Sequence, residues 1–220
     1  GQNFDGRQFI PQALSAGVRL VILELAEGES APVTLQGYAA LVVSDIRRCQ
    51  DLLARAFYGN PSQRLFCFGV TGTNGKTSTT YLIEHFLNEA GMLTGVIGTI
   101  DHHLQGHPPW KTTHTTPDSI RLQSRLAEMV KLGAKAVAME VSSHALAQAR
   151  VESVDFNTVV FTNLTQDHLD YHHTMDEYFA AKQRLFSDLL WNSGKYPTVA
   201  VVNVDDFWGC RLRLAGTAGL

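Results

Sequence analysis

The chain has 220 residues, of which 45% are hydrophobic and 18% charged, and its formal net charge is −3. These values are typical of a globular protein with one large or two small domains, and they provide no general basic surface for nucleic acid. The three cysteines form no CxxC pair, no stretch of about 18 apolar residues could span a membrane, and no signal-peptide pattern opens the chain, so we expect a cytoplasmic protein with free thiols. We also expect a monomer.

Residues 1–62 are predicted to form a small α/β unit. A helix is expected at 9–14, where the apolar residues share one face and Gly17 follows, and β-rich runs cover 18–25 and 39–43. Asp45 is placed to cap a second helix, whose apolar residues are Ile46, Leu52, Leu53 and Phe57. The turn cluster at 59–62 indicates a domain boundary.

Residues 63–220 alternate between apolar strands and helices. Strands are predicted at 65–70, 95–100, 134–141, 158–162 and 198–203. One helix should run to about Ala90, with Leu82 and Phe86 on its apolar face, and another should start at Pro117 and bury Ile120, Leu122, Leu126, Met129 and Val130. This alternation predicts an α/β fold with a mostly parallel sheet, whose ligands bind beyond the carboxyl ends of the strands.

The segment Gly69-Val-Thr-Gly-Thr-Asn-Gly-Lys-Thr-Ser78 lies between a predicted strand and a predicted helix. Its glycines let backbone N–H groups approach an anion, and the helix N-terminus and Lys76 add positive charge. The Thr77 hydroxyl can ligate Mg²⁺. The strict P-loop pattern has glycine where this chain has Val70, so the segment is a shortened P-loop-type variant that favours nucleotide binding.

Glu140 ends an apolar strand near this loop, and a carboxylate there is a suitable Mg²⁺ ligand. A purely structural interpretation of the same segment is a helix cap at Ser142 or Ser143, and both interpretations can hold.

Residues 162–173 contain several potential metal ligands. His168 and His172 are four residues apart, but no glutamate lies between them as in zinc proteases, so we favour an imidazole that supplements carboxylates around a second Mg²⁺. The alternative is that His172 and His173 are ordinary surface histidines. The helix expected at 178–186 is amphipathic, and on composition alone Lys182 would be a solvated cation.

Four motifs, in this order, resemble those of the Mur ligase family: residues 72–77, 140–144, 163–170 and 180–182. Within that family, the segments 5–10, 115–117 and 142–150 are most similar to the members that add the third residue to the peptidoglycan peptide. The resemblance covers nearly the whole chain. It implies a partial UDP-binding amino-terminal domain at 1–62 and a partial ATP-binding central domain at 63–220.

The resemblance also implies an activity, that of an ATP- and Mg²⁺-dependent ligase. ATP would phosphorylate the D-glutamate carboxylate of UDP-MurNAc-L-Ala-D-Glu, and the amine of meso-diaminopimelate or L-lysine would attack the acyl phosphate. Such phosphoryl transfer needs positioning and charge neutralisation more than a covalent protein group.

Family positions then assign roles to individual residues. ATP would contact Gly72, Thr73, Asn74, Gly75, Lys76, Thr77 and Ser78. The catalytic residues would be Lys76, Glu140, His168 and Lys182. Thr77 and Glu140 would hold one Mg²⁺, and His168 with a carbamylated Lys182 would hold a second, because a bare ammonium would repel the metal ions. The muramoyl peptide would contact Thr115, Thr116, Ser142, Gln148 and Arg150. His114 departs from the family pattern.

Two other interpretations remain open. A folylpolyglutamate synthase would have a similar fold and phosphate loop, although the segment 142–150 favours the muramoyl substrate. A non-catalytic nucleotide-binding fragment is the second. The chain starts and ends without a closing element, so we expect it to be truncated at both ends and to be inactive as a ligase by itself.

Overall fold

The computed structural model describes residues 5–25, 29 and 38–214, and the chain divides into two compact units, Gly1–Cys49 and Gln50–Leu220. This division lies before the domain boundary expected at 59–62, inside the helix α2 (Ile46–Phe57). The residues 1–4 and 215–220, on which the expectation of truncated ends depended, lie outside the described residues.

The first unit contains the elements expected from the sequence. A 3₁₀ turn, η1 (Gly6–Phe9), leads into α1 (Ile10–Ser15), and β1 (Leu20–Glu24) pairs in parallel with β2 (Ala39–Val43). The small core of this unit contains Ile10 and Leu23. Asp45 caps α2 as predicted, since its Oδ1 atom accepts hydrogen bonds from the amides of Arg47 and Arg48, both at 3.0 Å.

The expected apolar face of α2 is not its buried face. Leu52, Leu53 and Phe57 are exposed, and the buried residues of the helix are Asp51 and Ala54. A specific contact explains the orientation, because the amide of Ser153 donates a hydrogen bond of 2.6 Å to the Asp51 carboxylate. The face of α2 that packs inward is therefore the one that carries Asp51 and its polar contact, and not the one that carries the apolar residues.

The second unit contains a six-stranded sheet within residues 66–202, in the order β5-β4-β6-β3-β7-β8. Its strands are β3 (Phe66–Thr71), β4 (Thr94–Ile97), β5 (His102–Leu104), β6 (Ala136–Glu140), β7 (Thr158–Phe161) and β8 (Val199–Val202). All neighbouring pairs are parallel except β4 with β5. The mostly parallel sheet is therefore confirmed, while the short strand β5, which has no long apolar run, was not predicted.

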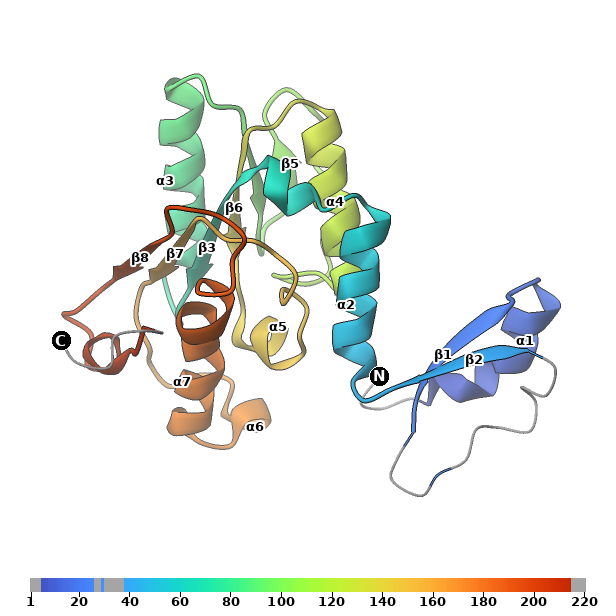
Figure 1. Ribbon diagram of the computed structural model, residues 1–220. Helices are drawn as coiled ribbons and strands as arrows, with labels where there is room; N and C mark the ends of the chain where they lie inside the picture. Colours follow the sequence, from blue (N-terminus) through green and yellow to red (C-terminus); the bar gives the residue numbers. More distant parts are fainter. Residues whose placement is uncertain (1–4, 26–28, 30–37, 215–220) are drawn as a thin grey trace. The chain divides into compact units, whose positions relative to one another are not determined.

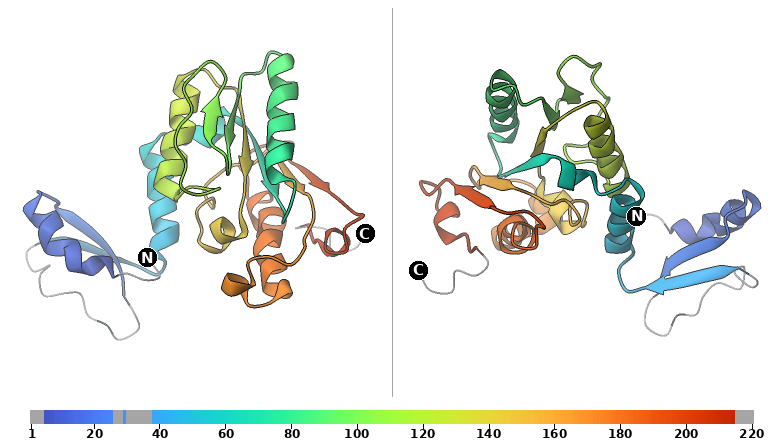
Figure 2. Two further views of the ribbon diagram at one scale, coloured as in Figure 1. Left: turned by 180° about the vertical axis from the view of Figure 1, so that it is seen from behind. Right: turned by 45° about the horizontal axis from the view of Figure 1, so that its top comes forward.

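Helices cover the two faces of this sheet unequally. The helical elements are η3 (Pro61–Arg64), α3 (Lys76–Glu89), α4 (Ser119–Lys131), α5 (Ser143–Ala147), α6 (Leu169–His172), α7 (Met175–Arg184), the π-helical turn η4 (Leu185–Leu189) and η5 (Gly209–Arg211). Figures 1 and 2 show α3 and α4 on opposite sides of the strands. Right-handed crossovers require this arrangement, because the chain moves along the sheet in opposite directions from β3 to β4 and from β4 to β6.

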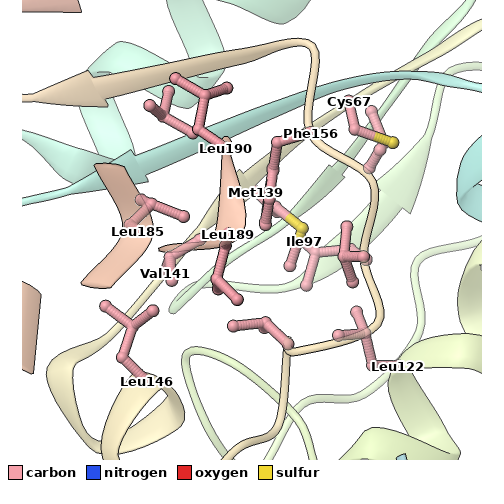
Figure 3. Close-up of a cluster of buried hydrophobic side chains, with 14 of the residues drawn as sticks. Cys67, Ile97, Leu122, Met139, Val141, Leu146, Phe156, Leu185, Leu189 and Leu190 are labelled. Carbon is pink, nitrogen blue, oxygen red and sulfur yellow. The ribbon is translucent and has the colours of Figure 1, made fainter. Parts of the chain in front are cut away.

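The main core lies on the α4 side of the sheet. Leu122 of α4 and Leu185 and Leu189 of η4 pack with Met139 of β6 and Phe156 (Figure 3). The sequence correctly predicted that Leu122, Leu126 and Met129 are buried. It was wrong about Ile120, which is exposed, and Val130 is only partly buried. Leu82 and Phe86, expected on the apolar face of the preceding helix, are also exposed.

On the opposite face of the sheet, α3 has one buried residue, Thr80.

Within the described ranges, no helix has the length and apolarity needed to cross a bilayer.

The carboxyl ends of four parallel strands meet at one edge of the sheet. The residues that come next in the chain are the loop 72–75 after β3, Gly98 and Thr99 after β4, Val141 and Ser142 after β6, and Thr162 and Asn163 after β7. The connection after β3 runs to one face of the sheet, and the connections after β6 and β7 run to the other face. Open α/β sheets form their ligand crevice at the point where neighbouring connections diverge in this way.

Candidate active site

The glycine-rich loop between β3 and α3 is held in shape by residues that follow β7. Gly72 has a φ of 143°, and a Cβ atom there would lie 2.0 Å from the Thr162 hydroxyl oxygen, so this position requires glycine. Gly75 has a φ of 84° and precedes α3. The Asn74 carbonyl accepts hydrogen bonds from Thr162 Oγ1 at 2.7 Å and Asn163 Nδ2 at 3.1 Å. The N-cap residue of α3 is Gly75, which has no side chain to bond the first amides of the helix, and uncapped amides of this kind can bind an anion.

Lys76 folds back over this loop. Its Nζ atom donates hydrogen bonds to the carbonyl oxygens of Gly72 at 2.9 Å and Thr73 at 2.8 Å. Partial burial lowers the pKa of Lys76. The first helical residue thus places a cation where the loop would surround a phosphate.

Lys182 is not the solvated side chain that composition predicts. It is 1% exposed, its Nζ atom donates a 3.0 Å hydrogen bond to the Gly72 carbonyl, and it lies 4.5 Å from the centre of the Tyr178 ring. Burial, and then the nearby charge of Lys76, lower the pKa of Lys182 to about 7. Burial therefore favours the neutral, nucleophilic form of this amine more than it is favoured in a solvated lysine.

Glu140 is fully buried at the end of β6 and is held by two threonines. Its Oε1 atom accepts hydrogen bonds of 2.9 Å from the Thr77 hydroxyl and from the Thr99 amide, and its Oε2 atom accepts one of 3.0 Å from the Thr99 hydroxyl. The Thr99 and Thr115 hydroxyl oxygens lie 3.0 Å apart. At Gly98 a Cβ atom would come within 2.5 Å of Glu140 Oε1, so glycine makes this close approach possible. Carboxylate and hydroxyl oxygens of this kind are the ligands that Mg²⁺ prefers.

A chain of hydrogen bonds leads away from Glu140 through the other predicted substrate residues. The Thr116 hydroxyl donates to the Glu140 carbonyl at 2.8 Å and accepts from the Ser142 amide at 3.0 Å. Arg150 donates from Nη1 to the Thr116 carbonyl at 2.9 Å and from Nε to Gln148 Oε1 at 3.1 Å. These residues, predicted separately from the sequence, are joined into one polar wall.

The segment after β6 also fulfils its structural interpretation. Ser142 Oγ accepts a 3.1 Å hydrogen bond from the Ala145 amide and so caps α5, while Ser143 is the buried first residue of the helix. The cap predicted at these serines is therefore confirmed.

His144 of α5, His168 before α6 and His172 of α6 form a cluster of rings, in which His168 and His172 lie beside Tyr178. His168 is exposed, and its ring centre lies 4.9 Å from that of His144 and 5.9 Å from that of Tyr178. The surface interpretation of His172 is wrong, because this side chain is buried and burial lowers its pKa to about 4. His173 is exposed, in agreement with the alternative surface interpretation.

These histidines do not form a metal centre by themselves. Across the described part of the chain, no group of three or more histidines, cysteines and acidic residues is arranged to hold a metal ion. A Mg²⁺ site would instead need oxygen ligands from the nucleotide and water beside Thr77 and Glu140, as is usual for this ion.

The structure thus brings the predicted residues into two adjoining groups, one around the Gly72 carbonyl and one around Glu140. The arrangement can bind a polyphosphate at the loop and hold a hard cation against Glu140. Ser78 lies exposed in the first turn of α3. Thr99 was missed because the strand predicted at 95–100 included it, whereas β4 ends at Ile97 and leaves Thr99 free to bond Glu140. Thr162 lies in the segment predicted to carry ligands, but its contact with the loop was not predicted.

Comparison with known proteins adds an independent finding. The family profile described as "Mur ligase middle domain" matches residues 70–217. A protein of Synechococcus elongatus, named UDP-N-acetylmuramoyl-L-alanyl-D-glutamate–2,6-diaminopimelate ligase, is 47% identical over 213 residues, which are 96% of this chain and 42% of that protein. The chain therefore spans about two fifths of the length of such curated relatives.

Solved structures agree with this match. A structure of a UDP-N-acetylmuramoyl-L-alanyl-D-glutamate–2,6-diaminopimelate ligase is similar with a TM-score of 0.73 and 31% identity, covering 94% of this chain and 39% of that one. The folylpolyglutamate synthase of Mycobacterium tuberculosis, solved with ADP and AMPPCP, has a TM-score of 0.59 at 13% identity and covers 75% of this chain and 43% of its own. At that identity the second likeness shows a shared fold alone.

Proposed function

This chain belongs to the Mur ligase family, and we propose that it forms the nucleotide-binding part of an ATP-dependent ligase that joins a diamino acid to UDP-MurNAc-L-Ala-D-Glu. The observation that carries this proposal is the pairing of the buried Glu140 with Thr77 beside the Lys76 loop. Burying a carboxylate costs free energy unless a positive charge pairs with it, and next to a phosphate-binding loop a divalent cation would supply that charge.

The same residues fit Mg²⁺-ATP. Thr77 and Glu140 would hold the ion, which when bound neutralises phosphate charge and polarises the γ-phosphoryl group. Lys76 and the first amides of α3 would bind the β- and γ-phosphates. Thr99 keeps both oxygens of Glu140 oriented through its amide and hydroxyl.

Lys182 is proposed to carry a carbamate in the active protein. The ammonium first loses a proton to solvent, and the neutral amine attacks the carbon of CO₂. A C–N bond forms as one C=O π pair moves onto oxygen, and a second proton leaves to solvent, so that the cation is replaced by an anion. The burial of Lys182 and its pKa of about 7 support this step, because only the neutral amine reacts. With His168, the carbamate would then form a second position for Mg²⁺.

The polar wall from Thr115 to Arg150 is proposed to bind the muramoyl peptide. Arg150 offers a guanidinium group for a carboxylate, and Gln148 orients it through Nε. Because this wall begins at the Glu140 carbonyl, it would place the D-glutamate carboxylate next to the γ-phosphate. In-line positioning of these two groups can supply ~7–11 kcal/mol of the barrier reduction.

The diamino acid is proposed to be 2,6-diaminopimelate rather than lysine. The basis is the activity for which the Synechococcus relative and the solved ligase are named, not a residue of this chain.

A chimera tests the ligase activity. The matching segment of the Synechococcus enzyme would be replaced by this chain, and tripeptide formation from ATP, UDP-MurNAc-L-Ala-D-Glu and diaminopimelate followed by mass spectrometry. We expect product, and none when the chimera also carries Lys76→Ala. A folded chimera that binds ATP but makes no tripeptide, beside an active parent enzyme, would count against the proposal.

A further inference from the structure

His103 lies between two carboxylates outside the polar wall and the loop. Its Nδ1 atom is 2.6 Å from Asp101 Oδ1, and its Nε2 atom is 3.0 Å from Glu84 Oε1. The three side chains are only 13–32% exposed. Because both ring nitrogens face carboxylate oxygens, the geometry requires both to be donors, which is the charged imidazolium form.

The surroundings support that charge. The hydrogen bond to Glu84, with that to Asp101 second, raises the pKa of His103 to about 9 against the opposing effect of burial. Tyr81 of α3 lies beside the ring, at 5.3 Å between centres, and its hydroxyl donates to Asp101 Oδ1 at 3.3 Å. On β5, burial lowers the pKa of His102 to about 4, so this neighbour is neutral and adds no competing charge.

These contacts join two parts of the proposed nucleotide site. Glu84 belongs to α3, the helix that begins at Lys76 and Thr77. Asp101 closes a tight turn after β4, in which the Gly98 amide donates a 3.2 Å hydrogen bond to the Asp101 carbonyl. Thr99 lies within this turn and binds both oxygens of Glu140.

We propose that His103 is a positioning residue for Mg²⁺-nucleotide binding, because it clamps α3 to the turn 98–101 and so brings Thr77 and Thr99 together on Glu140. The inference rests on the proposed function. It assigns His103 no contact with nucleotide or metal. Groups that hydrogen-bond directly to metal ligands typically contribute 10–100-fold to metal affinity or activity, and His103, which acts through the turn 98–101, is expected at the lower end of that range.

Calorimetric titration with AMPPCP, with and without Mg²⁺, tests the clamp. The measured quantity is the gain in nucleotide affinity that Mg²⁺ provides. We expect His103→Ala to reduce this gain about 10-fold while the affinity without Mg²⁺ stays unchanged. The matched control is His85→Ala, an exposed histidine next to Glu84 on the same helix, which should leave the gain unaltered.

The pH profile separates positioning from a merely structural role. In the wild-type chain the Mg²⁺-dependent gain should fall as pH rises through about 9, where His103 loses its proton. In His103→Arg, which stays charged, that step should be absent. An NMR titration of the His103 ring without metal or nucleotide provides a second readout, and its midpoint should drop in Glu84→Gln.

The outcomes are distinguishable. A wild-type chain that does not bind AMPPCP, or that binds it independently of Lys76, overturns both the proposed function and this inference. Binding that depends on Lys76, with an equal Mg²⁺ gain in His103→Ala and wild type, overturns the inference alone. If His103→Ala does not fold, the same decision follows from Glu84→Gln and from the comparison of the wild-type and His103→Arg pH profiles.

Discussion

Lys76 and Lys182 donate hydrogen bonds to the same atom, the carbonyl oxygen of Gly72, at 2.9 and 3.0 Å. The two residues are far apart in the sequence, and two ammonium groups on one acceptor repel each other. The arrangement is stabilised when Lys182 is neutral, and more so when it carries a negative group. This shared acceptor links the phosphate loop to α7 and motivates the first two predictions.

Lys76→Ala should weaken ATP binding roughly 10–100-fold, because a hydrogen bond to a charged group contributes ~1.5–3 kcal/mol. Calorimetry on the purified chain measures the change. Lys131→Ala, at the exposed end of α4, is the matched control and should bind ATP like the wild type. Equal affinities in Lys76→Ala and the control would contradict the phosphate-binding loop.

Lys182 should take up CO₂ as a carbamate. With ¹³C-labelled bicarbonate, we expect a carbamate carbon signal in the NMR spectrum that grows, at constant dissolved CO₂, as pH rises through about 7 and the amine loses its proton. Lys182→Arg should lose the signal, whereas Lys195→Arg should keep it. A signal that persists in Lys182→Arg would assign the carbamate elsewhere.

Gly98→Ala should disturb Glu140 without changing a charged group. The new methyl group would lie 2.5 Å from Glu140 Oε1, so the carboxylate must move away from Thr77 and Thr99. We expect the Mg²⁺-dependent part of nucleotide affinity to fall about 10-fold. Gly194→Ala, where the nearest atom is 3.7 Å away, is the control, and an identical Mg²⁺ dependence in both variants would argue against a metal at Glu140.

Asp51→Asn should stabilise the chain at neutral pH. Burial raises the pKa of Asp51 from 3.8 to about 6, so the folded state holds this proton more tightly than the unfolded state. The favourable contribution is present below about pH 4 and is lost as pH rises through 6. Above that, the buried charge costs about 1–3 kcal/mol. Asparagine would keep an acceptor for the Ser153 amide and remove the charge.

Urea unfolding at pH 4 and pH 8 checks this stabilisation. Asp51→Asn should gain stability over wild type only at the higher pH, and the exposed Asp205→Asn should show no such difference. Equal stability of Asp51→Asn and wild type at both pH values would mean that Asp51 is not desolvated in the folded chain.

The sheet could be predicted because its central strands are continuous apolar runs. The loop at 72–78 and Glu140 could be located because they follow such runs, whereas the roles expected for Lys182 and the substrate residues came from the family resemblance. The buried faces of α2 and α3 could not be predicted from the sequence. On α2 the inward contact is made by Asp51. On α3 the buried residue is Thr80, and Leu82 and Phe86 are on the exposed part of the helix. Periodicity alone does not identify which face meets a partner.

The environment of Lys182 depends on contacts that local sequence does not encode. A lysine on an amphipathic helix is ordinarily solvated, but α7 packs so that this side chain lies beneath the Gly72 carbonyl, 110 residues earlier in the chain. Thr99 was missed for the same reason, since its partner Glu140 comes from a different strand. The histidine clamp also needs β5, a strand too short to predict.

Binding of UDP-MurNAc-L-Ala-D-Glu to the purified chain in the presence of Mg²⁺-AMPPCP tests the central claim most directly. The account predicts saturable binding by calorimetry that is strongly weakened in Arg150→Ala, no change for the exposed Arg64→Ala, and no binding of a pteroylglutamate. Binding of the pteroylglutamate in its place, or muramoyl-peptide binding that is indifferent to Arg150, would contradict it.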